Sequence, residues 1–66
     1  MEHKNHQLIK SLALKAIDLS GKNCYELERS CWLITHEYHH GVKPVEYDIR
    51  EIDEDLYLQV LTEVKR

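Results

Sequence analysis

The sequence predicts an all-α fold, and three observations support this. Apolar residues recur at three- and four-residue spacing over three segments, which is the periodicity of amphipathic helices. Only two glycines and one proline occur in 66 residues, and they fall between those segments. Helix-stop and helix-start residues also flank the segments. We therefore expect a single domain spanning residues 1–66, built as a small three-helix bundle or as a helical hairpin plus a C-terminal helix.

The first helix is expected at about residues 5–20. Its apolar positions cover about half of the helix surface, as expected for a helix that packs against a core. Gly21 follows at the position where a left-handed residue commonly ends a helix. The apolar face consists of Leu8, Ile9, Leu12, Ala13, Ala16, Ile17 and Leu19.

The second helix is expected at about residues 24–40, with Asn23 as its N-cap and Gly41 as its stop. Its main apolar stripe consists of Cys24, Leu27, Cys31, Ile34 and Tyr38. A second group, Tyr25, Trp32 and His36, lies about 120–150° away around the helix. One small core cannot absorb both groups. We therefore predict that the second group contacts a protein partner, and a homodimer is the first such partner to consider.

The third helix is expected at about residues 49–65, and its start is less well defined than its end. Either Asp48 or Asp53 can cap it. Pro44 favours extended backbone in the residue before it, and the apolar residues Val45, Tyr47 and Ile49 alternate with polar ones. This pattern leaves open whether a short extended segment at 43–48 forms a strand or a coil.

Charge is distributed unevenly along the chain, whose net charge is −3. Four lysines against two acidic residues give residues 1–22 a charge of +2, whereas five basic against ten acidic residues give residues 23–66 a charge of −5. This balance argues against nucleic acid as a partner. A run of acidic residues, interrupted by one arginine, predicts contact with a protein that has a basic surface. The run consists of Glu46, Asp48, Glu51, Asp53, Glu54 and Asp55.

The segment 36–40, with the sequence HEYHH, matches the pattern H-E-x-x-H on a predicted helix. It resembles the motif of the zincin metalloproteases, and the resemblance implies zinc bound by His36 and His40 with Glu37 as general base. The resemblance covers only these five residues. The 26 residues after His40 contain no further histidine and are too few to build the zincin architecture. We therefore predict a protein that is not an enzyme and needs no cofactor, and we keep a zinc-binding protein using His36 and His40 as an alternative.

A second alternative comes from the connection at residues 20–23, which resembles the turn of a helix-turn-helix protein. The following helix begins with Glu26 and Glu28, which would be repelled by DNA phosphates. A DNA-binding regulator is therefore the less favoured interpretation.

No window holds the ~18 apolar residues of a membrane span, the N-terminal residues are polar, and only two cysteines occur. We expect a cytoplasmic protein without membrane contact. The sequence as a whole predicts a small non-enzymatic regulatory or interaction protein, which binds another protein through an aromatic helix face and an acidic surface.

Overall fold

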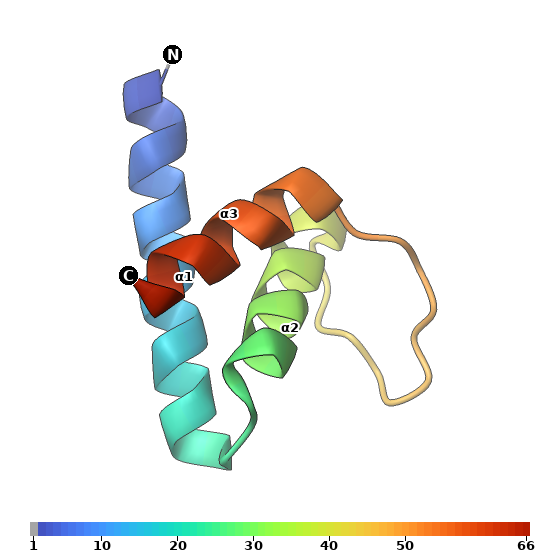
Figure 1. Ribbon diagram of the computed structural model, residues 1–66. Coiled ribbons are helices and arrows are strands. Elements are labelled where there is room, and N and C mark those ends of the chain that lie inside the picture. Colours follow the sequence, from blue (N-terminus) through green and yellow to red (C-terminus); the bar gives the residue numbers. More distant parts are fainter. Residues whose placement is uncertain (1) are drawn as a thin grey trace.

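Three helices and two connections make up residues 2–66 (Figure 1). The computed structural model describes the backbone of residues 2–66 and the side chains from residue 6 onward. Helix α1 spans Glu2–Asn23, α2 spans Leu27–His40 and α3 spans Glu54–Lys65. Residues 2–66 contain no strand, so the all-α prediction is confirmed and the extended segment at 43–48 is coil.

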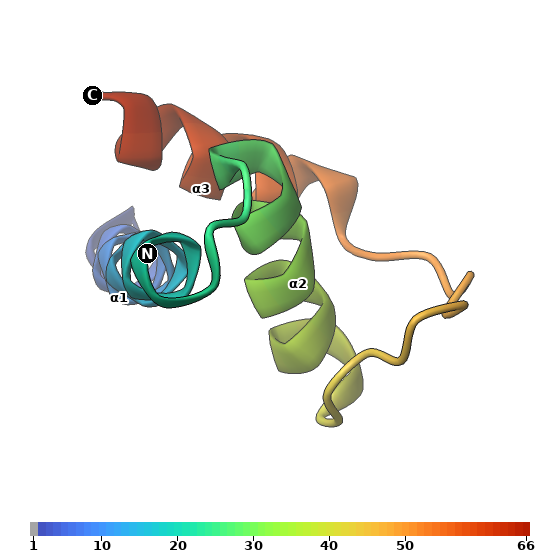
Figure 2. The ribbon, with the colours of Figure 1, turned by 90° about the horizontal axis from the view of Figure 1, so that it is seen from below.

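The core lies where all three helices meet, and each helix packs against the other two. Figure 2 looks along α1, with α2 beside it and α3 above. Small residues on the inner face of α1 let the other helices approach closely, and the buried positions follow the helical periodicity of each segment. The buried apolar residues are Ile9, Leu12, Ala13, Ala16, Cys31, Ile34 and Val60.

The first connection differs from the prediction at both of its ends. Helix α1 continues through Gly21 to Asn23, because glycine permits a left-handed turn but does not impose one. The left-handed residue is instead Cys24, with φ of 60°. The side-chain amide of Asn23 donates to the carbonyl oxygen of Leu19 at 3.3 Å, so Asn23 ends α1 and does not cap α2. The N-cap of α2 is Glu26, whose side chain makes no capping hydrogen bond.

The second connection runs from residue 41 to residue 53. Gly41 ends α2 as predicted, with φ of 74° and its backbone N–H donating to the carbonyl oxygen of Glu37 at 2.8 Å. The predicted start of α3 near residue 49 is wrong. The helix begins after Asp53, whose carboxylate accepts the backbone N–H of Leu56 at 3.1 Å. Of the two N-cap residues that the sequence allowed, Asp48 and Asp53, the structure has Asp53.

The 41–53 loop lies on the side of α2 and α3 that faces away from α1, as both ribbon views show (Figures 1 and 2). The Cα positions extend over 34 × 24 × 15 Å, and the 22 residues of α1 account for the longest dimension. Among the described residues, none of the helices combines the length and the apolar character that a bilayer span requires.

Candidate partner-binding surface

A buried histidine connects α2 to the 41–53 loop. The side chain of His36 is fully buried, and its Nε2 lies 3.1 Å from Oδ2 of Asp48 in the loop. Neither ring nitrogen of His36 makes a hydrogen bond of good geometry. The contact between His36 and Asp48 is therefore electrostatic, and it is an ion pair when the imidazole is protonated. The rings of Trp32 and His40 lie 5.0 Å and 4.4 Å from the His36 ring, between centroids. The three aromatic rings share one face of α2 because they are four residues apart.

Arg50 holds the Asp48 carboxylate in place. The Nη2 and Nε of Arg50 donate to the two carboxylate oxygens at 2.6 Å and 3.1 Å, and its backbone N–H donates to Oδ1 at 3.0 Å. The side-chain hydrogen bonds of Arg50 and then its backbone N–H hold the pKa of the Asp48 carboxyl well below its usual range, and His36 adds to this effect. Asp48 is therefore ionised at neutral pH, although its side chain is only 3% exposed.

A second contact fixes the loop three residues before α3 begins. The Nε2 of His40 lies 2.7 Å from the carbonyl oxygen of Glu51. Since a carbonyl oxygen only accepts, His40 must donate this hydrogen bond through a protonated Nε2. The contacts of His36 and His40 hold the loop against α2. Within the loop, the Asp48 N–H donates to the carbonyl oxygen of Val45 at 3.0 Å and forms a turn.

The aromatic face of α2 is therefore covered in part by the chain itself. Our sequence-based expectation placed His36 and Asp48 on a surface that contacts a partner, but both side chains are buried in the loop contact. Trp32 is half-buried, with the guanidinium of Arg29 5.6 Å from its ring centroid. Tyr25 is exposed and belongs to the first connection, not to a helix.

The loop exposes apolar side chains at its outer end. Val45, Tyr47 and Ile49 are 69%, 84% and 94% exposed, and we call these three residues the loop tip. Their alternation with polar residues predicted an extended segment, with Ile49 at the start of the third helix. Asp48 lies between Tyr47 and Ile49 and points inward to His36. The neighbouring side chains of the turn at 45–48 therefore point outward.

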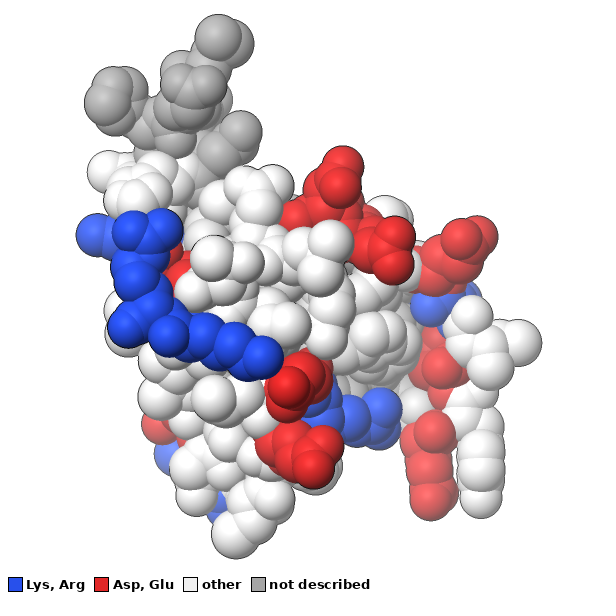
Figure 3. All heavy atoms as spheres, viewed as in Figure 1, with Lys and Arg blue, Asp and Glu red and all other residues white. Residues whose placement is uncertain are grey.

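Acidic side chains surround the loop tip. Figure 3 shows them gathered over the loop and the start of α3, while basic side chains lie near the C-terminal end of α3. Five of the six residues in the predicted acidic run are exposed: Glu46, Glu51, Asp53, Glu54 and Asp55. The sixth, Asp48, is the buried one. The exposed carboxylates and the apolar tip thus lie within one segment, residues 45–55, which runs from the loop into the first turn of α3.

The predicted metal pair is arranged differently from a zinc site. The rings of His36 and His40 are close, but their Nε2 atoms face Asp48 and the Glu51 carbonyl oxygen, respectively. Among residues 6–66, no group of three or more histidine, cysteine, aspartate or glutamate side chains is placed to hold one ion. Glu37 lines a separate groove between α1, α2 and the first residues of the loop.

The cysteines also differ in their surroundings. Cys31 is fully buried, and burial raises the pKa of its thiol, so it is a neutral core residue. Cys24 is exposed in the first connection. The two thiols therefore belong to separate regions and do not form a common reactive site.

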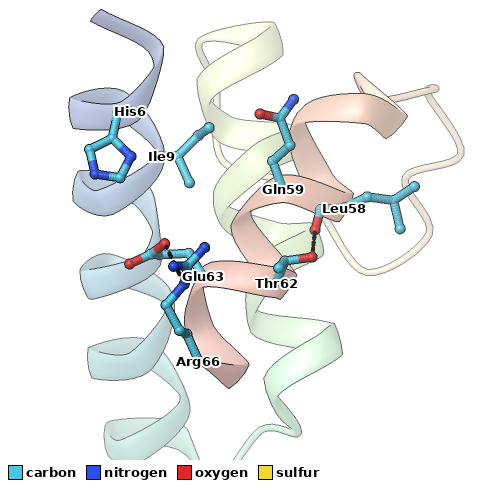
Figure 4. Close-up of a pocket in the computed structure, with 7 residues that line it drawn as sticks. All are labelled: His6, Ile9, Leu58, Gln59, Thr62, Glu63 and Arg66. Atoms are coloured by element: carbon cyan, nitrogen blue, oxygen red, sulfur yellow. Dashed lines mark hydrogen bonds and ion pairs between the residues drawn. The ribbon is translucent and has the colours of Figure 1, made fainter. Parts of the chain in front are cut away.

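Two of the hollows that lie outside the loop contact flank α1. One, of about 300 Å³, lies between α1 and α3, where His6 and Ile9 face Gln59 and Glu63 (Figure 4). The other is a groove of about 430 Å³ between α1, α2 and the first residues of the loop. Its lining includes the apolar residues Leu19, Leu33 and Ile34 and the basic residues Lys15, Lys22 and Lys43.

These features define a small all-helical protein with a long loop that is anchored to its second helix. The chain belongs to the family described as a domain of unknown function (DUF8662), whose model matches residues 7–66. The match includes all of α2, the loop and α3, and most of α1. No curated protein and no solved structure was found to be similar to this chain.

Proposed function

We propose that this protein is a non-enzymatic interaction protein, a small regulator or adaptor, which binds another protein chain through its loop tip and the acidic residues beside it. The observation that carries the proposal is the exposure of Tyr47 and Ile49 on a loop that buried side chains hold in place. Loops of this length are commonly functional, and solvated loops seldom present large apolar residues at their outer end.

The energetics favour a binding role over a purely connecting role. Fully burying one large apolar side chain stabilises a complex by roughly 1.5–3 kcal/mol, and the loop offers three such side chains in five residues. Because Asp48 and His40 contacts already restrict the loop, little conformational entropy is lost when a partner binds it. The exposed carboxylates favour a partner with a basic surface around an apolar groove.

The aromatic residues of α2 contribute to this proposal indirectly. His36 makes the loop contact with Asp48, and Trp32 packs against the His36 ring, so both support the conformation that exposes the tip. The binding surface that we propose is therefore the loop. Tyr25 is exposed in the first connection and lines the groove between α1, α2 and the first residues of the loop.

Affinity capture from the source cells tests the proposal. A tagged wild-type chain should retain a defined set of protein chains, identified by mass spectrometry, and Tyr47→Ser should lose that set. The matched control is Leu58→Ser, which changes an apolar side chain on α3 that is 51% exposed and lies outside the loop. Equal capture by wild type and Tyr47→Ser, or no specific capture at all, would contradict the proposal.

A further inference from the structure

We propose that the partner of the loop tip is a second copy of this chain, which receives the tip in the groove between α1, α2 and the loop. The inference rests on the proposed function, because it identifies the partner of the same surface. It is carried by two features of one molecule, the loop tip and the groove, whose apolar character matches and whose charges are opposite.

The groove combines apolar lining with a basic rim. Leu19 of α1 and Leu33 of α2 are among its apolar side chains, and Lys15, Lys22 and Lys43 supply positive charge. Lys22 forms an ion pair with Asp18 at 3.3 Å. Among the side chains that the structure describes, Lys15 and Lys43 make no ion pair and are available to an acidic ligand.

Acidic residues also line this groove, but the basic ones exceed them. Asp18 and Glu37 stand against three lysines, so the lining has a net charge of +1. With Asp18 already paired to Lys22, the lysine ammonium groups that remain lie at Lys15 on α1 and Lys43 on the loop. An apolar ligand that carries negative charge fits this lining best.

The loop tip and the residues beside it in the loop have those properties. Residues 45–53 carry four acidic side chains and one basic side chain, which gives this segment a charge of −3. The single basic residue, Arg50, is paired with Asp48 within the loop. Glu46 is exposed and lies between Val45 and Tyr47, so negative charge accompanies the apolar tip into any groove that receives it.

The position of the two features also suits a closed dimer. Pro44 lines the groove, and Val45, the next residue, begins the loop tip. A two-fold axis near this point places each tip at the groove of the other copy, so that both contacts form at once and no surface remains for further copies. A stable dimer buries about 800 Å² per partner, which is roughly one-sixth of the 5094 Å² surface of this chain.

The first experiment measures self-association of the purified full chain by sedimentation equilibrium over roughly two decades of concentration. The wild-type chain should form dimers and no larger species. Tyr47→Ser should raise the dimer dissociation constant by at least about tenfold, since it removes a large buried side chain from both contacts. Leu58→Ser is the matched control, and its dimer should be as stable as that of the wild type.

The second experiment exchanges charges between the two features. Glu46→Lys and Lys15→Glu should each raise the dimer dissociation constant, because each places like charges together twice in a symmetric dimer. An equimolar mixture of the two variants should dimerise as well as the wild type. In the mixed dimer, the altered tip of one chain meets the altered groove of the other, and the remaining contact has wild-type charges on both sides.

The outcomes separate this inference from the proposed function. A wild-type chain that stays monomeric at every concentration overturns the second-copy inference, whereas affinity capture of a different protein that depends on Tyr47 would still support the proposed function. A dimer that neither Tyr47→Ser nor the charge exchange affects also overturns the inference, because another surface must then form the dimer. If capture also fails to depend on Tyr47, the proposed function is contradicted as well.

Discussion

The two connections of this protein join helices in different ways. The first spans three residues, 24–26, and depends on local features: Cys24 adopts a left-handed conformation, and the hydroxyl of nearby Ser20 donates to the carbonyl oxygen of Tyr25 at 2.6 Å. The second spans thirteen residues, 41–53, and depends on side chains that reach back to α2, above all Asp48. The short connection does no more than reverse the chain. The long one is held in a defined shape and presents apolar residues to solvent.

This difference indicates where function resides. A connection between two packed helices commonly needs only two to eight residues, so much of the second loop exceeds what the fold requires. Burying a carboxylate beside a histidine is costly unless the charge is paired, and here Arg50 pairs it. The chain thus maintains a polar buried contact whose main structural effect is to position an exposed loop tip.

The largest expected effect comes from removing the histidine that anchors the long loop. His36→Ala should lower the free energy of unfolding by about 2–4 kcal/mol, because it leaves a cavity and removes a contact of Asp48. Urea denaturation followed by circular dichroism measures the change. The matched control is His39→Ala on the exposed side of the same helix, where the effect should stay within about 0.5 kcal/mol. Equal effects of the two substitutions would mean that the loop contact contributes no stability.

An intermediate effect is expected from acid. The folded-state pKa of Asp48 lies below the unfolded-state value, so its contribution to stability is fully present above the unfolded pKa of about 3.9 and is lost as the pH falls toward the folded pKa. The urea midpoint of the wild type should therefore fall as the pH is lowered from neutral to below 4. In Asp48→Asn the fall should be shallower, while Asp55→Asn, which changes an exposed carboxylate, should follow the wild type. Parallel curves for all three proteins would contradict this account.

The smallest effect is expected at the short connection. Cys24→Gly should raise the free energy of unfolding by about 0.5–1 kcal/mol, since glycine adopts the left-handed conformation without the steric cost of a side chain. Cys24→Ala keeps the Cβ atom and should give no gain. Thermal unfolding compares the two variants. A gain with alanine equal to that with glycine would show that the thiol, and not the backbone conformation, determines stability here.

Helical periodicity predicted the fold well because it reflects burial directly. The buried residues Leu12, Ala16 and Cys31 all lie on predicted apolar faces. The ends of the helices were harder to predict, because several residues can serve as stops or caps. Gly41 ended a helix as expected, whereas Gly21 did not, and no local signal distinguishes the two glycines.

The site was only partly predictable. The sequence pointed to His36 and Asp48 as exposed contacts, and to Arg50 only as the single basic residue within the acidic run. Their association joins residues that are twelve positions apart across a loop without regular structure, and no periodicity reports such a pairing. The sequence shows the alternation of Val45, Tyr47 and Ile49, but a period of two is also the pattern of a strand. A strand and an exposed loop tip are distinguished here only by the inward position of Asp48, which the sequence does not reveal.

The anchoring of the loop has a consequence for proteolysis. Tyr47 is the most exposed aromatic residue of the chain and therefore the most accessible position for a protease that cleaves after aromatic residues. The next residue is Asp48, and a protease must draw both into an extended conformation, which requires release of Asp48 from His36 and Arg50. The cleavage rate after Tyr47 then depends on how often the loop opens, so limited digestion of the native protein measures that local opening equilibrium.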